Sequence, residues 1–192
     1  MPKKYLIKLN SLCAATLALG CAFASLAQAQ GEAASDATKA ASAMSATEKL
    51  SPGDQQFIQD AGQSGATEIA ASKLALSKSS DAQVKRFAQR MIADHAKLAR
   101  NLDILAKRHG ITAAPSADSA VIGSLQNLQG AEFDKAYIEK VVGGHQKAVE
   151  LFKKESESGN DAQLKTAATR ALPIIQHHFE MAQQLAKAKA SA

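Results

Sequence analysis

Three histidines and one glutamate interrupt apolar patterns that are otherwise regular. In four segments of the chain, apolar residues recur every three or four positions, which places them on one face of a helix. Once in each segment a polar residue takes the place of an apolar one, at Glu68, His95, His145 and His178. Each lies near the middle of its segment, and the middles of packed helices of equal length share one level. We therefore expect these four side chains to meet inside a helical bundle.

Burying a carboxyl group and several imidazoles is costly unless they are paired or ligated. One arrangement that offsets the cost is a metal ion, because imidazole nitrogens and a carboxylate suit Zn, Cu, Fe or Mn. The other is a hydrogen-bonded glutamate–histidine network that only sets the register of the helices. The residue types leave both open. Asp94, next to His95, either orients a metal-binding histidine through a hydrogen bond to its other ring nitrogen or is a solvated residue at the edge of the core.

A dinuclear oxygen-activating centre is not expected. The di-metal site of helical bundles takes Glu-x-x-His from each of two helices. Here the residues three positions before the histidines are Ile92, Val142 and Ile175, so a metal site in this chain would be mononuclear. The chain also has no nucleophile elbow and no phosphate-binding glycine loop. We therefore do not expect an enzyme.

Four long helices have to position these residues. The apolar periodicity predicts them, with one shorter helix at 118–128, over 52–79, 80–109, 131–158 and 161–188. Ser51, Ser80 and Asn160 stand where they would cap the first, second and fourth long helices. Short turns join the first two helices and the last two. The long connection in the middle favours an all-α, ferritin-like four-helix bundle with a long crossover between the second and third helices.

Residues 1–29 have the pattern of a signal peptide. Three lysines precede an apolar stretch, and Ala27-Gln28-Ala29 has the small-x-small pattern of a cleavage site. An uncleaved anchor is the alternative, although the apolar stretch is short for a membrane span, and lipidation at Cys21 is another. We expect a flexible Ala/Ser/Thr-rich tether over 30–51 and the helical domain over 52–188. The protein would then be exported to the periplasm or cell envelope, without a transmembrane span in its mature form.

The positions of the cysteines and the net charge argue against a disulfide-bonded protein, a thiolate metal site and a nucleic-acid-binding protein. Cys13 and Cys21 lie inside the signal segment, so the mature chain has no disulfide and no thiolate metal site. The whole chain has 23 basic and 18 acidic residues. Without Lys3, Lys4 and Lys8 the balance is 20 to 18, a net charge of +2. Most of the excess basicity therefore belongs to the export signal, and a nucleic-acid partner is not expected.

Four separated segments resemble one family. They are the stretches 68–75 and 84–95, the stretch 133–138 followed by His145, and the stretch 172–178. Their sequences and order are similar to the domain of unknown function numbered 4142, over roughly residues 52–188. The resemblance implies a ferritin-like four-helix domain in exported bacterial proteins labelled as outer-membrane or periplasmic. It implies no established activity.

Two functions remain as hypotheses. The first is a non-catalytic, stress-related envelope protein, either alone or as a homo-oligomer, whose helical surface binds another envelope protein or polymer. If the partner is an anionic polymer, it would face the basic residues of the second long helix. An ordinary solvated surface also explains these residues: Arg86, Arg90, Lys97, Arg100, Lys107 and Arg108. The second is a mononuclear metal-binding or metal-handling protein with one Zn, Cu, Fe or Mn ion at the cluster of Glu68, His95, His145 and His178.

Overall fold

Helices make up most of residues 49–191, the part of the chain that the computed structural model describes. They are α2 (Pro52–Lys78), α3 (Ala82–Arg108), α4 (Ser119–Gln126), α5 (Gly130–Ser158) and α6 (Ala162–Ala190). These described residues contain no strand, which confirms the all-α class. Every helix begins and ends within two residues of its predicted range. The predicted signal peptide and all but the last residues of the predicted tether lie outside the described residues.

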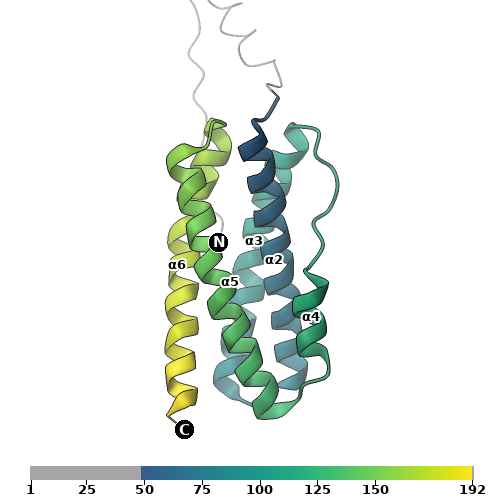
Figure 1. Cartoon of the computed structure of the whole chain (residues 1–192), viewed down its shortest axis with the longest axis vertical. Helices are drawn as coiled ribbons and strands as arrows, with labels where there is room; N and C mark the ends of the chain where they lie inside the picture. Colours follow the sequence, from purple (N-terminus) through teal and green to yellow (C-terminus); the bar gives the residue numbers. More distant parts are fainter. Residues whose placement is uncertain (1–48, 192) are drawn as a thin grey trace, which may run out of the picture. The chain divides into compact units, whose positions relative to one another are not determined.

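The four long helices form a bundle, and the short α4 packs against α2 and α5 (Figure 1). In the bundle α2 lies beside α3 and α5, and α6 lies beside α5 and α3. No helix in the described part of the chain is long and apolar enough to cross a membrane. The four long helices pack through the apolar faces that they turn toward one another.

Side-chain caps set where the helices begin. Ser51 caps α2, as predicted. The predictions for α3 and α6 were wrong by one residue, because the caps are Asp81 and Asp161 rather than Ser80 and Asn160. Each aspartate accepts hydrogen bonds from the backbone N–H groups two and three positions ahead. A carboxylate also interacts favourably with the positive end of the helix dipole, which a neutral hydroxyl or amide does not match.

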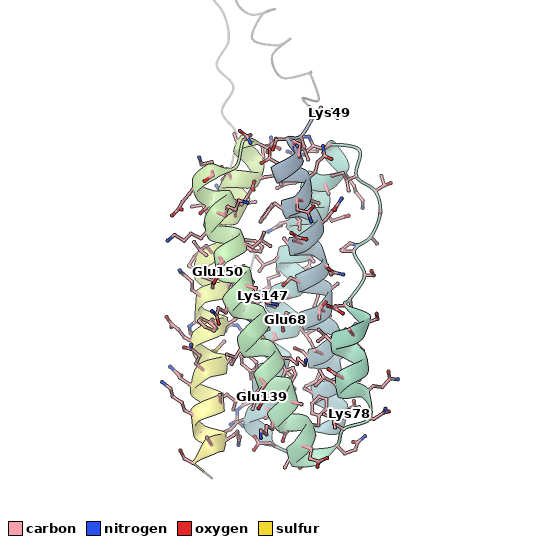
Figure 2. The ribbon with its side chains drawn as sticks, viewed as in Figure 1. Lys49, Glu68, Lys78, Glu139, Lys147 and Glu150 are labelled. Atoms are coloured by element: carbon pink, nitrogen blue, oxygen red, sulfur yellow. The ribbon has the colours of Figure 1, made fainter. Side chains whose placement is uncertain are left out.

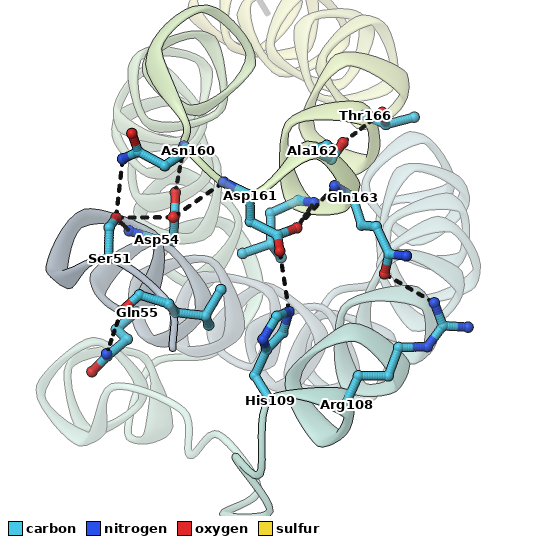
Figure 3. A network of polar contacts seen from close by, with 12 residues as sticks. Ser51, Asp54, Gln55, Arg108, His109, Asn160, Asp161, Ala162, Gln163 and Thr166 are labelled. Atoms are coloured by element: carbon cyan, nitrogen blue, oxygen red, sulfur yellow. Dashed lines mark hydrogen bonds and ion pairs between the residues drawn. The ribbon is translucent and has the colours of Figure 1, made fainter. Parts of the chain in front are cut away.

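One end of the bundle is held by a network of polar contacts (Figure 3). Asp54, in the first turn of α2, accepts hydrogen bonds from the backbone N–H groups of Asn160 at 3.0 Å and Asp161 at 3.2 Å. The Nε2 of His109, just after α3, lies 3.3 Å from the Oδ2 of Asp161. The start of α2, the end of α3 and the α5–α6 turn therefore meet at this end, which we call the Asp54 end.

The ends of the helices also give their directions. At the end of the bundle opposite the Asp54 end, Asp81 before α3 pairs with Lys189 near the end of α6. Consequently α3 and α5 both run toward the Asp54 end, whereas α2 and α6 run away from it. The connection over residues 109–129, which includes α4, runs from one end to the other beside α2 (Figure 1).

A buried hydrogen bond between α2 and α5 offers a test of the packing. The hydroxyl groups of Ser72 and Tyr137 lie 2.8 Å apart, and both residues have no exposed surface. Tyr137→Phe leaves the Ser72 hydroxyl without its partner, and we expect the free energy of unfolding to fall by about 1–3 kcal/mol. Adding Ser72→Ala should recover part of the loss in urea unfolding, because no unpaired hydroxyl then remains. A double variant that loses the sum of the two single losses would contradict this coupling.

Candidate metal centre

Three histidines from three helices meet in the middle of the bundle. His95 of α3 is 5% exposed, His145 of α5 is 1% exposed and His178 of α6 is fully buried. The ring centroids are 5.3 to 5.7 Å apart. Each ring offers one nitrogen such that the three nitrogens all lie within 4.8 Å of one another. The structure thus brings together the three histidines that interrupt the apolar pattern.

Hydrogen-bond partners indicate which nitrogens carry protons. The Nδ1 of His145 lies 3.0 Å from the carbonyl oxygen of Val141. The Nε2 of His178 lies 3.2 Å from the Oδ2 of Asp94. A carbonyl and an ionised carboxylate only accept hydrogen bonds, so both of these nitrogens donate. In the neutral imidazoles this leaves a lone pair on Nε2 of His145 and on Nδ1 of His178.

These two lone pairs lie in surroundings that suit a cation. The Nδ1 of His178 is buried and has no hydrogen-bond partner. The Nε2 of His145 faces the Nε2 of His95 at 3.4 Å. Two ligands on a tetrahedral zinc ion with Zn–N bonds of about 2.0–2.1 Å are separated by about 3.3 Å. The measured separation therefore fits two nitrogens on one ion, and the unpartnered nitrogen of His178 can serve as the third ligand.

Burial keeps the three imidazoles neutral. It lowers the pKa of His95 to about 3, helped by the neighbouring His145 and His178. It also lowers the pKa of His145 to about 4, against the opposing effect of the Val141 carbonyl. The pKa of His178 is lowered by burial as well, although Asp94 acts in the other direction. Neutral imidazole is the form that binds metal ions.

Asp94 lies at the junction between the histidines and the surface. Burial raises the pKa of its carboxyl group, but hydrogen bonds from Arg90 and His178 outweigh this and hold the pKa below its usual range. Arg90 pairs with Asp94 one turn away on α3, and the Nζ of Lys97 lies 3.6 Å from its Oδ1. Asp94 is thus an ionised carboxylate that orients the His178 ring. A carboxylate behind a histidine is the usual companion of a metal ligand.

Glu68 lies beside His145 but on the side away from the other two histidines. Its Oε1 is 3.5 Å from Nδ1 of His145, whereas the lone pair of that ring is on Nε2. Figure 2 shows Glu68 where α2 and α5 lie side by side. Its Oε2 is buried without a hydrogen-bond partner, and burial raises the pKa of the carboxyl group to about 8. That Glu68 binds a metal ion directly stays a prediction. In this structure its carboxyl group lies beside His145 and outside the space between the three histidine rings.

A glycine makes room for this carboxyl group. A Cβ atom added to Gly144 of α5 would lie 2.6 Å from the Oε1 of Glu68, well inside van der Waals contact. Glu68 also lines an open pocket of about 400 Å³ together with residues of α2, α5 and α4. The absence of a side chain at Gly144 therefore allows a buried acid to lie between the histidine cluster and this pocket.

Comparison with known proteins identifies the family. A family model described as Domain of unknown function (DUF4142) matches residues 39–185. The chain belongs to this family. The resemblance carried by the four segments is thereby confirmed. The match takes in every residue of the histidine cluster of this DUF4142 protein, together with Glu68 and Asp94.

The other comparisons bear on the fold. No curated protein matches this DUF4142 protein. Among solved structures, the crystal structure of a DUF305 fragment from Deinococcus radiodurans is similar, with a TM-score of 0.64 and 15% sequence identity. The match covers 72% of this chain and 98% of that chain. At this identity the likeness shows the fold alone.

Sequence reasoning missed a pair of buried acids at the Asp54 end. Asp54 is 2% exposed and Glu155 is 6% exposed. Burial and the neighbouring Asp54 raise the pKa of Glu155 to about 7, and its Oε1 has no hydrogen-bond partner. A signal was present, because Glu155 lies three positions after Phe152 and seven after Ala148 on the apolar face of α5. Glu155 interrupts that face just as His145 does.

The raised pKa of Glu68 predicts a dependence of stability on pH. In the unfolded chain the carboxyl group titrates near its ordinary value of 4.5, and in the folded protein near 8. Between these values the folded protein binds the extra proton, so its stability falls as the pH rises toward 8. Glu155, with a pKa of about 7, titrates over part of the same range, so we expect the free energy of unfolding of metal-free protein to fall up to pH 8 through both groups. Urea unfolding of Glu68→Gln should show a smaller fall, and equal slopes in both proteins would contradict the assignment.

Alanine substitutions at two adjacent glycines test whether the space beside Glu68 is needed. Gly144→Ala should destabilise the protein by about 1–3 kcal/mol, because the new methyl group meets the buried carboxyl group. Gly143→Ala has nothing within 4 Å of the added atom and should stabilise the helix by up to about 1 kcal/mol. Thermal unfolding of the two variants beside the parent protein measures the difference. Equal effects of the two substitutions would mean that Gly144 is not needed to accommodate Glu68.

Proposed function

We propose that this protein is an exported helical-bundle protein that binds one transition-metal ion through His95, His145 and His178, and that it is not an enzyme. The observation that carries the proposal is the convergence of three buried imidazole nitrogens within 4.8 Å of one another. They come from α3, α5 and α6, so the ion would also tie three helices together. Three protein ligands leave at least one coordination position for water or another molecule.

The donor set favours some ions over others. Neutral imidazole suits Zn, Cu and Fe, whereas Mn prefers carboxylate and water. Of the four ions considered from the sequence, Zn, Cu and Fe therefore fit the three nitrogens better than Mn does. In this proposal Asp94 holds the His178 ring in position from behind, and the Val141 carbonyl does the same for His145. Glu68 would become a fourth ligand only by turning toward the cluster.

A purely structural network is the competing explanation of the same residues. In that arrangement the Nε2–H of His95 would donate to the Nε2 of His145 across 3.4 Å. The Nδ1 of His178 and the Oε2 of Glu68 would still lack partners. A network that exists only to fix helix register gains most when every buried polar atom is satisfied. The unpartnered nitrogen of His178 supports the metal hypothesis over this alternative, because a bound ion would give it a partner.

The cellular setting is part of the proposal. The signal-peptide pattern of residues 1–29 supports export to the periplasm or cell envelope. We further assign the domain to the ferritin-like bundles, with residues 109–129 as the long crossover. A surface role in binding an envelope partner stays a prediction. Several basic residues considered for it already have partners: Arg90 and Lys97 with Asp94, Lys107 with Asp103, and Arg108 with Gln163.

Metal content is the direct test. The protein should be produced from the full-length chain without a histidine tag, then analysed for metal as isolated and after incubation with Zn, Cu, Fe or Mn. We expect about one ion per chain and a rise in melting temperature, because a ligand at 100 times its dissociation constant stabilises by about 2.7 kcal/mol. His95→Ala/His178→Ala should bind none. No ion in the parent protein under any of these conditions would overturn the proposal in favour of the structural network.

The role of Asp94 can be tested separately on the same helix. Asp94→Asn keeps the shape of the side chain but weakens its hold on the His178 ring, and we expect metal affinity to fall by about 10- to 100-fold. Asp103→Asn is the matched control, because Asp103 is an exposed residue of α3 that pairs with Lys107 alone among the described residues. Competition titration against a chelating dye measures both affinities. Equal affinities of the two variants would remove Asp94 from the site.

A further inference from the structure

A cavity of about 1180 Å³ opens in the half of the bundle nearest the Asp54 end. All four long helices and residues 111–116 contribute to its lining. Its lining residues on α3 begin at His95 and continue to Ala106, and those on α6 end at Ile175, just before His178. The cavity therefore extends from the level of the histidine cluster toward the Asp54 end. It is far larger than one metal ion requires.

The cavity exists because this half of the core is filled less well than the other half. Between the histidines and the α2–α3 turn, the bulky Met91, Phe133 and Tyr137 have no exposed surface. On the cavity side, several inward positions hold only a methyl group: Ala61, Ala148, Ala168 and Ala171. The larger apolar side chains of α3 that line the cavity, including Leu98 and Leu102, are only partly buried. Covering apolar surface of this kind contributes about 25 cal/mol per Å², so an apolar occupant would bind favourably.

The dimensions of the cavity match a hydrocarbon chain. From His95 to Ala106 the lining spans eleven residue-to-residue steps of α3, which is about 16 Å at the helical rise of about 1.5 Å per residue. The hydrocarbon core of a bilayer is about 30 Å thick, so the acyl chains of one leaflet span about 15 Å. From Arg170, eight residues before His178 on α6, the histidine level is about 12 Å away at the same rise, which is within the reach of a medium-length acyl chain.

The charged residues of the lining indicate the head group. They are Asp60, Asp103 and Arg170. Asp103 is paired with Lys107 at 2.8 Å, and Asp60 accepts a hydrogen bond from the side chain of Gln56 at 2.9 Å. Arg170, an exposed residue of α6, has no ion pair in the described part of the chain. Its guanidinium group is a planar donor that matches a carboxylate.

We propose that this cavity binds a fatty carboxylate, with the carboxylate on Arg170 and the hydrocarbon tail extending along α3 toward His95. The tail would cover the partly buried leucines, and the charged head would stay at the rim, where water reaches it. This inference goes beyond the metal site and does not require it, because the apolar lining and Arg170 are present whether or not an ion occupies the histidines.

Calorimetric titration with dodecanoate tests the proposal on metal-free protein produced from the full-length chain. We expect saturable binding of one dodecanoate per chain. Arg170→Gln should weaken binding by about ten-fold or more, since a hydrogen bond to a charged group is lost. Arg100→Gln is the matched control and should bind as the parent does, because Arg100 is an exposed arginine of α3 outside the cavity lining.

Filling the cavity gives a second and independent readout. Ala171→Phe should abolish dodecanoate binding by occupying the space of the tail, and circular dichroism shows whether the variant is folded. If it does not fold, the smaller Ala168→Leu serves the same purpose. No binding by the parent protein would overturn the proposal, as would parent-like binding by both Arg170→Gln and a folded cavity-filling variant. A dimer by light scattering that binds no dodecanoate would overturn it too, by assigning the cavity to a second copy of the chain.

The same titration repeated with one equivalent of Zn separates this inference from the proposed function. Protein that binds dodecanoate but no metal supports the cavity site and contradicts the metal site. Protein that binds metal but no dodecanoate supports the metal site and contradicts the cavity site.

Discussion

Burying imidazoles and a carboxyl group halfway along a helical bundle is the constraint on which the rest of this structure depends. Each ring has to find a hydrogen-bond partner because it is buried. His145 uses the carbonyl one turn back in its own helix, and His178 uses Asp94 of the neighbouring helix. The Gly144 position has to stay small so that Glu68 can reach the same level. These partners fix the rotation and the register of four helices together.

The polar level also divides the core into two unlike halves. On the side of the α2–α3 turn, large side chains fill the space between the helices, with Phe133 and Tyr137 stacked at 5.9 Å. On the other side, alanines leave the open cavity. In a domain without disulfides, stability comes from apolar burial, to which both halves contribute. Under our proposal, the open half also holds a ligand. The polar contacts of Asp54, Asp161 and His109 hold the helix ends together where the core between them is open.

Much of the fold could be predicted from the sequence because its signals are local. A helix places every third or fourth residue on one face, so the apolar pattern of α3, from Val84 through Met91 to Leu98, marks its buried side before any neighbour is known. The same periodicity singled out His95, His145 and His178 as buried positions. It also pointed to Glu155, which was overlooked. The caps at Asp81 and Asp161 were misjudged by one residue because serine, asparagine and aspartate all compete for that position.

By itself, then, the sequence determined the four long helices, their apolar faces and the polar residue in the middle of each, since all of these follow from backbone geometry within one helix. Only the tertiary structure decided how the polar residues meet. It brought one nitrogen each of His95, His145 and His178 within 4.8 Å of one another, and it put Glu68 beside the Nδ1 of His145. It also left the cavity between His95 and the Asp54 end. These features depend on the distances between helices that are far apart in the chain, and no pattern within a single helix specifies them.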